Sequence, residues 1–151
     1  MAGGASGVQL RVARNPMQEP GPGASLRCGL AQVAPSMSAV MVLLADQPLL
    51  ELPDVRAVLR AWSGRAPGTQ LVVPTYQGQP GHPLVFGAEL RQWLATQPAT
   101  AGVRDWRRAH AKQVHTLLLD HPRCTRDIDT PEDLQTLADE HGVVLRWPVS
   151  I

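Results

Sequence analysis

Short hydrophobic runs alternate along the chain with segments whose apolar residues recur at helical spacing. The most hydrophobic run covers residues 38–45 and is nearly all apolar, as is typical of a strand buried on both faces of a sheet. Apolar or alternating residues predict further extended segments at 8–12, 70–76, 83–86 and 114–119. Glycine and proline residues fall between these segments and mark the turns.

Helix signals occupy the intervals between the predicted strands. Ser25 is a candidate N-cap for a helix, and Pro53-Asp54 begins another in which apolar residues recur at helical spacing. Thr130-Pro131, followed by two acidic residues, predicts the start of a last helix. Two more helices are expected, at 88–96 and 103–112. This alternation predicts an α/β fold with three layers, in which a mostly parallel sheet carries helices on both faces.

Composition sets the class of protein. The chain has 151 residues, 44% of them hydrophobic and 18% charged, which suits one globular domain over residues 8–151. Fourteen Lys and Arg residues against thirteen Asp and Glu give no field that attracts nucleic acid or an anionic membrane. The longest apolar run is too short to span a bilayer, and no signal-peptide h-region precedes it. Cys28 and Cys124 suggest neither a metal site nor a disulfide framework, so we expect a cytoplasmic protein.

Asp46 directly follows the most hydrophobic run, and Pro48 ends that strand two residues later. In open α/β sheets, ligands bind in the crevice beyond the carboxyl ends of the strands. A carboxylate at this position is suited to hold a divalent metal ion and, with it, a phosphate group. The alternative is that Asp46 only ends the strand or caps a turn.

Other short patterns accompany the Asp46 turn in a fixed order. They are Asn15-Pro16 with Gly23–Leu26, then Ala45–Pro48, Gly81-His82-Pro83 and the Asp-Ile-Asp-Thr-Pro-Glu-Asp segment at 127–133. Together they resemble the nucleotidyltransferases that finish the molybdenum cofactor, and the Gly-His-Pro element is most similar to the cytidylyltransferase branch. The resemblance extends from Val8 to Leu137. It implies a Rossmann-like nucleotidyltransferase fold, of which this chain is the later, N-terminally incomplete part.

The resemblance implies transfer of CMP from CTP to molybdopterin, with release of pyrophosphate and with Mg²⁺ as the cofactor. The residues quoted do not separate CTP from GTP. Asp46 then serves as catalytic residue and metal ligand. Asp129 is the candidate second carboxylate, because the Asp127-Ile128-Asp129 segment precedes a helix and is expected beside the same crevice. The nucleotide or the second substrate is expected to contact Ser25, Gln47, Pro48, Gly81, His82 and Pro83.

Most of these residues also have an ordinary structural explanation. Asp129 begins a complete helix-capping arrangement, and Ser25 has its own helix to cap. His82 is equally well explained as an exposed loop histidine without a chemical task. Asp127 and Asp133 are interpreted as surface or capping groups.

The family domain begins with a strand and a glycine-rich loop that grips the triphosphate. Residues 1–7 resemble this loop, but no strand precedes them and no arginine follows at the expected place, so we interpret them as a flexible tail and expect the loop to be absent. Two alternatives therefore stay open. The first is a catalytically incomplete fragment that pairs with a partner chain or a second copy through an open sheet edge. The second is a nucleotidyltransferase with a sugar-phosphate or isoprenoid-phosphate acceptor.

Overall fold

A computed structural model of the chain describes residues 10–15, 22–98 and 100–146. The predicted tail at 1–7 and the first two residues of the predicted strand at 8–12 lie outside these ranges. Residues 10–15 have no regular secondary structure, so that strand prediction is wrong for the part described. Leu10 and Val12 are 90% and 86% exposed, and no sheet partner offsets the cost of ordering this segment.

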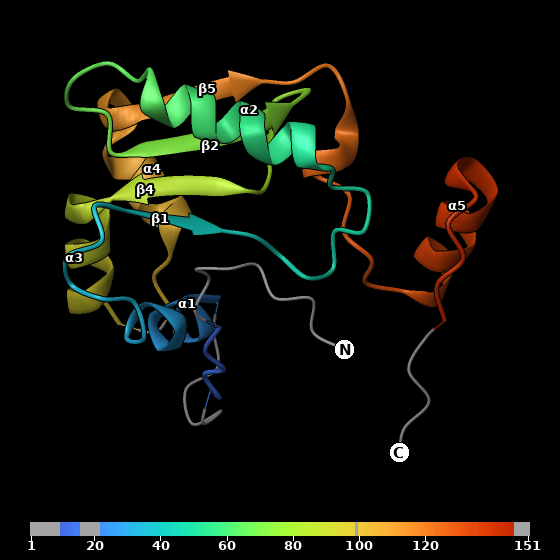
Figure 1. Ribbon diagram of the computed structural model, residues 1–151, viewed down its shortest axis with the longest axis horizontal. Coiled ribbons are helices and arrows are strands. Elements are labelled where there is room, and N and C mark those ends of the chain that lie inside the picture. Colours follow the sequence, from blue (N-terminus) through green and yellow to red (C-terminus); the bar gives the residue numbers. More distant parts are fainter. Residues whose placement is uncertain (1–9, 16–21, 99, 147–151) are drawn as a thin grey trace.

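The centre of the fold is a single open sheet (Figure 1). Its strands are β1 (Ala39–Val42), β2 (Leu71–Tyr76), β3 (Gln79–Pro80), β4 (Leu84–Gly87) and β5 (Val114–Leu118). Strand β4 lies antiparallel between β1 and β2, β5 is parallel to β2, and the short β3 pairs with the end of β2. Three of the longer strands, β1, β2 and β5, therefore run in one direction.

The predicted α/β fold is confirmed, and its sheet combines the parallel strands β1, β2 and β5 with two antiparallel strands, β3 and β4. Strand β2 turns back into β3 through Gln77-Gly78, whose φ angles of 47° and 80° fit a tight hairpin turn. The chain then enters β4 after only a few residues. A connection this short allows only an antiparallel neighbour, because a parallel one needs a crossover of a dozen or more residues.

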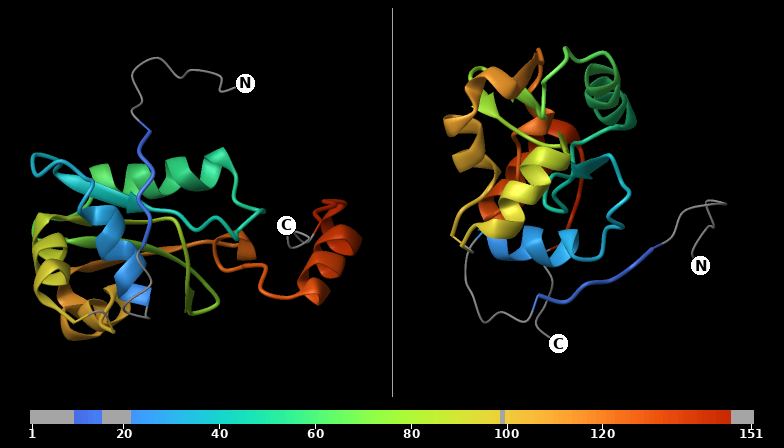
Figure 2. Two further views of the ribbon diagram at one scale, coloured as in Figure 1. Left: turned by 90° about the horizontal axis from the view of Figure 1, so that it is seen from below. Right: turned by 90° about the vertical axis from the view of Figure 1, so that its left-hand side faces the viewer.

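Helices cover both faces of the sheet (Figure 2). On one face lies α2 (Leu52–Ser63), and on the other lie α1 (Pro22–Leu30), α3 (Ala88–Thr96) and α4 (Val103–Ala109). Two 3₁₀ turns, η1 (Ala111–Gln113) and η2 (Pro122–Cys124), flank β5. The last helix, α5 (Pro131–His141), stands apart from the sheet in Figure 1. No helix among the described residues is long and apolar enough to cross a membrane.

Alternate residues of the central strands build two hydrophobic cores. Leu71 and Phe86 face α1, α3 and α4, whereas Val72 and Val85 pack against Val58 of α2. These four strand residues are at most 2% exposed. The helix predicted to begin at Pro53-Asp54 corresponds to α2, the helix predicted at 88–96 to α3 and the strand predicted at 70–76 to β2. The apolar side of each element packs into these cores.

Two predictions about the first half of the chain are wrong. Ser25 does not cap a helix, since α1 already begins at Pro22, and the Ser25 hydroxyl instead accepts a hydrogen bond from Asn15 Nδ2 at 3.1 Å. The run at 38–45 is not buried on both faces. All four residues of β1 are partly exposed, and Leu43 and Leu44 beyond it are 52% and 37% exposed. Among the described residues β1 is an edge strand, so only one of its sides is covered.

Candidate functional site

Loops from distant parts of the chain meet at one edge of the sheet. Val42 at the end of β1 pairs with Leu84 at the start of β4, and Thr75 near the end of β2 pairs with Leu118 at the end of β5. The carboxyl ends of three strands and the entry to β4 therefore share this edge, which is where open α/β sheets bind ligands. The Asp46 turn follows β1, the Gly-His-Pro segment precedes β4, and η2 with the acidic segment follows β5.

The His82 imidazole lies in the electrostatic field of two carboxylates from different segments. Burial lowers its pKa below 6.5, while the negative charges of Asp46 and Asp127 act in the opposite direction and raise the pKa. The backbone N–H of Ile128 donates to the carbonyl oxygen of Asp46 at 2.9 Å and joins the two acidic loops. Asp46 itself is exposed and free to meet a ligand.

The sequence indicates a surface or capping group at Asp127, and in the structure its negative charge also acts on His82, whose pKa it raises. Its side chain is exposed, as expected, but it lies close enough to influence the imidazole. The sequence predicts that the Asp127-Ile128-Asp129 segment lies beside the crevice, but no pattern in it indicates which of its two carboxylates influences His82. Asp129, the predicted second carboxylate, is also exposed, and its backbone N–H donates to Asp133 Oδ2 at 3.0 Å within the cap of α5.

The predicted helix cap at Thr130 is confirmed. The Thr130 hydroxyl oxygen accepts from the Asp133 N–H at 3.2 Å, and Asp133 Oδ2 accepts from the Thr130 N–H at 2.7 Å. The Thr130 hydroxyl also donates to Asp133 Oδ2 at 2.8 Å, and this bond is the main cause that holds the pKa of Asp133 below its usual value of 3.8. Asp133 is therefore a capping residue, as predicted.

Sequence reasoning missed the residue that connects these loops, Cys124. Its carbonyl oxygen accepts the His82 backbone N–H at 2.8 Å and the Gln47 side-chain Nε2–H at 3.1 Å. We call this arrangement the Cys124 junction. One backbone oxygen with two lone pairs thus joins the loop after β1, the loop before β4 and η2.

Gly81 fits the Cys124 junction because it lacks a side chain. A Cβ atom at this position would lie 2.0 Å from the Cys124 carbonyl oxygen and 3.0 Å from its Sγ. The sequence predicts contact with a ligand at Gly81; in the structure its close neighbour is the protein's own backbone at Cys124. Burial raises the pKa of the Cys124 thiol, which keeps it protonated near neutral pH.

The other predicted binding residues have distinct surroundings. Gln47 is 7% exposed, and its Oε1 has no hydrogen-bond partner among the described residues. Pro83 is fully buried and joined to His82 by a cis peptide bond. Pro48 lines a small cavity of about 40 Å³ beside Asp127 and α5.

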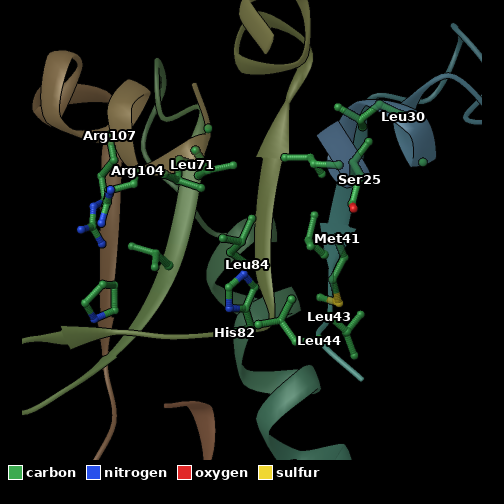
Figure 3. A pocket seen from close by; sticks show the side chains of 18 of the residues that line it. Ser25, Leu30, Met41, Leu43, Leu44, Leu71, His82, Leu84, Arg104 and Arg107 are labelled. Atoms are coloured by element: carbon green, nitrogen blue, oxygen red, sulfur yellow. The ribbon is translucent and has the colours of Figure 1, made fainter. Parts of the chain in front are cut away.

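A much larger pocket, of about 850 Å³, lies over the sheet between α1 and α4 (Figure 3). Its floor is apolar and includes Val42, Leu71 and Leu84. His82 and Ser25 lie on its wall, as do two cations of α4, Arg104 and Arg107. Asp46 is not among the lining residues, so the pocket adjoins the acidic loops and does not contain them.

A partly buried ion pair joins η2 to the start of α2. The Asp54 carboxylate at the start of α2 is 3% exposed and accepts from Arg123 Nε at 2.9 Å and Nη2 at 2.8 Å. The bond from Arg123 is the main cause that lowers the pKa of Asp54, and burial opposes it. His121 Nε2 lies 3.3 Å from the same carboxylate.

These acidic residues suit a metal ion whose ligands are mostly water and phosphate oxygens. Among the described residues no three His, Cys, Asp or Glu side chains gather closely enough to enclose a cation. Mg²⁺ and ions like it need only one or two protein carboxylates when phosphate oxygens and water complete the shell. Exposed Asp46, with Asp127 beside the same histidine, fits that kind of site.

An open α/β sheet with loops gathered at its carboxyl edge is the architecture of ligand-binding α/β domains. A family model described as the MobA-like NTP transferase domain matches residues 3–125, so the chain belongs to this family. The predicted resemblance to nucleotidyltransferases is thereby confirmed. A search of curated proteins gave no match.

Solved structures of mycobacterial proteins share the fold. Rv0371c from Mycobacterium tuberculosis H37Rv is 30% identical, with a TM-score of 0.61 over 78% of this chain and 59% of Rv0371c. Its complex with manganese gives 28% identity, a TM-score of 0.59 and coverage of 76% and 59%. A homologue of Rv0371c from Mycobacterium sp. strain JC1 is 23% identical, with a TM-score of 0.59 over 77% of this chain and 56% of its own. The chain thus spans less than two thirds of each of these relatives.

Proposed function

We propose that this domain takes part in the transfer of CMP from CTP to molybdopterin, with release of pyrophosphate and with Mg²⁺ as the cofactor. Membership of the NTP transferase family supports nucleotidyl transfer. The observation that carries the proposal is that the loops of Asp46, His82 and Asp127 share the carboxyl edge of the sheet: the Ile128 N–H donates to the Asp46 carbonyl at 2.9 Å, and the charges of both carboxylates raise the pKa of His82. The Gly-His-Pro segment favours the cytidylyltransferase branch.

Each group has a role in this proposal. Asp46 holds the metal ion, and Asp129 or the neighbouring Asp127 supplies a second carboxylate. When bound, the metal neutralises charge on the phosphates. His82, Gly81 and Ser25 lie on the wall of the large pocket, where a nucleotide or pterin would contact them. The buried positions of Gln47 and Pro83 favour a role in shaping the loops that carry the site. Two free thiols, at Cys28 and Cys124, agree with a cytoplasmic setting.

The direct test is Mg²⁺-dependent release of pyrophosphate from CTP in the presence of molybdopterin. Parallel reactions with GTP, a sugar phosphate and an isoprenoid phosphate decide the nucleotide and the acceptor. Turnover only with CTP and molybdopterin supports the proposal. Turnover only with another phosphate acceptor would replace it by the alternative nucleotidyltransferase, and no turnover with any pair would reject independent catalysis.

The metal assignment has its own measurement. Manganese bound to the protein is followed by electron paramagnetic resonance, with and without CTP. Asp46→Asn is expected to weaken Mn²⁺ binding by about tenfold or more, because a protein carboxylate leaves the metal shell. Asp127→Asn and Asp129→Asn then show which second carboxylate contributes. Asp139→Asn, on the exposed surface of α5, is the matched control. Unchanged affinity in Asp46→Asn would remove the assignment.

A second candidate function is favoured by the open edge of β1. In this candidate the domain works with a strand of a partner chain or of a second copy placed along β1. The partly exposed strand, the exposed Leu43 and Leu44 and the neighbouring apolar pocket are the observations that favour it. Light scattering after size-exclusion chromatography gives the mass of the purified chain. A monomer at all concentrations, active alone, would refute this candidate.

A further inference from the structure

The ion pair between Asp54 and Arg123 fixes η2 on the start of α2. Arg123 presents two donors to the two oxygens of one carboxylate, at 2.9 and 2.8 Å. The same carboxylate accepts the Glu51 backbone N–H at 3.0 Å, so it is also tied to the first turn of α2. A planar guanidinium that bonds at two points sets orientation as well as distance.

The residue after Arg123 carries the carbonyl oxygen of the Cys124 junction. Arg123 and Cys124 belong to the same 3₁₀ turn, which the Thr125 N–H closes by donating to the Pro122 carbonyl at 2.8 Å, so the anchoring of Arg123 restricts the direction of the Cys124 backbone. That carbonyl oxygen is the acceptor for both His82 and Gln47. A chain of direct contacts therefore runs from Asp54, through Arg123 and Cys124, to the two loops at the carboxyl edge of the sheet.

We propose that Arg123 is a positioning residue: its two-point bond to Asp54 aims the Cys124 carbonyl so that the His82 and Asp46 loops hold their places. The proposal rests on the proposed function, since it assigns these loops to the site of nucleotidyl transfer. Arg123 touches neither a substrate nor the metal ion in this role. It acts through backbone hydrogen bonds, and its effect is on geometry.

Stability alone does not explain the choice of an ion pair at this place. Apolar side chains of similar volume often replace a buried ion pair without loss of stability. Such a replacement would hold α2 against η2, but it would leave the rotation of η2 less defined. The close fit of Gly81 against the Cys124 carbonyl shows how little rotation the neighbouring loop tolerates.

Amide hydrogen exchange measures the junction directly, because the His82 N–H is one of its donors. In Arg123→Met, exchange at His82 is expected to rise by about tenfold or more relative to the amides of Leu71 and Val72 in the central strand. Arg126→Met is the matched control, since Arg126 pairs with Glu140 on the surface at 3.1 Å. Leu90→Ala controls for a general loss of stability.

Arg123→Lys separates charge from geometry and serves equally if Arg123→Met does not fold. A lysine keeps the positive charge but bonds as a single point. We expect exchange at His82 to be faster than in the native protein in this variant too. Native exchange at His82 in Arg123→Lys, or a rise no greater than that in Leu90→Ala, would overturn the proposal.

Kinetics supply a second readout once pyrophosphate release is established. Arg123→Met is expected to lower kcat by about tenfold with little change in the KM for CTP, because misplaced loops affect the reaction more than the binding. A rise in KM alone would contradict a positioning role. If the native protein releases no pyrophosphate, the proposed function fails, while hydrogen exchange still decides whether Arg123 controls the junction.

Discussion

The two sides of the candidate site differ in how firmly they are held. On the β4 side, the His82 loop is bonded to the Cys124 carbonyl and packed against it through Gly81. On the β1 side, the Asp46 turn leaves a partly exposed edge strand through two exposed leucines. The Asp46 turn is tied to the other loops by a side-chain bond, from Gln47 Nε2 to the Cys124 carbonyl at 3.1 Å, and by one backbone bond, from the Ile128 N–H to the Asp46 carbonyl.

As a result, His82 and Asp46 differ in how freely they can move before a ligand binds. Burial and direct backbone bonds fix His82 before any ligand arrives, which lowers the cost of ordering on binding. Asp46 follows β1, which has a neighbouring strand on one side only among the described residues. The geometry of the Asp46 turn therefore depends more than that of the His82 loop on what binds there, whether a metal ion, a nucleotide or another strand.

The largest effect is expected when a methyl group is added at Gly81, on the β4 side of the site. Gly81→Ala would put a Cβ 2.0 Å from the Cys124 carbonyl oxygen, where backbone must move to relieve the overlap. We expect a loss of about 3 kcal/mol or more in the free energy of unfolding, measured by urea denaturation. His82 exchange should rise along with it.

Gly29→Ala is the control for this prediction. Gly29 lies inside α1 with nothing within 4 Å of an added Cβ, so alanine there should stabilise the protein by about 0.5–1 kcal/mol. If Gly81→Ala were as stable as the native chain, the close packing of Gly81 against the Cys124 backbone would be refuted.

An intermediate effect is expected from the ion pair beneath η2. Because the pKa of folded Asp54 lies below 3.8, its stabilisation is complete above that pH and is lost as the pH falls through the folded pKa. Asp54→Asn should cost about 2 kcal/mol at pH 7, since Arg123 loses its charged partner.

Urea denaturation between pH 2 and pH 7 provides the measurement for Asp54. The difference in stability between the native protein and Asp54→Asn should shrink as the pH falls below 3.8. Asp139→Asn, at an exposed residue of α5, should show no comparable change. A difference that stays constant down to pH 2 would show that Asp54 does not titrate with a lowered pKa.

The smallest effect on the free energy of unfolding is expected for a substitution on the β1 side of the site. Leu43 is 52% exposed, so Leu43→Lys should change the free energy of unfolding of the monomer by less than about 0.5 kcal/mol. The same change at Leu90, which is fully buried, should prevent folding. A large loss of stability in Leu43→Lys, greater at higher protein concentration, would show that β1 is covered by a second chain.

Local pattern predicted most of the fold because the relevant signals are short in range. The apolar spacing after Pro53 gave α2, and the cap at Thr130 gave α5 almost to the residue. The status of β1 was misjudged, since an apolar run shows what a strand can bury and not how many neighbours it has. The antiparallel direction of β4 likewise follows from the hairpin before it, and the hydrophobic pattern alone does not predict that hairpin.

The candidate site was only half accessible to sequence reasoning. Asp46 and His82 carry chemistry in their side chains and occur in short motifs, so they could be singled out. Asp127 acquires its neighbour only when the loop after η2 folds back to the Asp46 turn. The partnership of Asp54 with Arg123 spans 69 residues, and no local spacing predicts it.

The acceptor at the Cys124 junction belongs to the main chain, and this has a consequence for genetics. Every amino acid at position 124 brings the same carbonyl, so a saturation library there would report on packing of the side chain and be blind to the bond itself. The requirement is displaced to the partners: to Gly81, which leaves the space, to Gln47, which donates an amide N–H, and to Arg123, next to it in the chain. In related sequences, joint variation at these three positions would therefore be more informative than variation at 124.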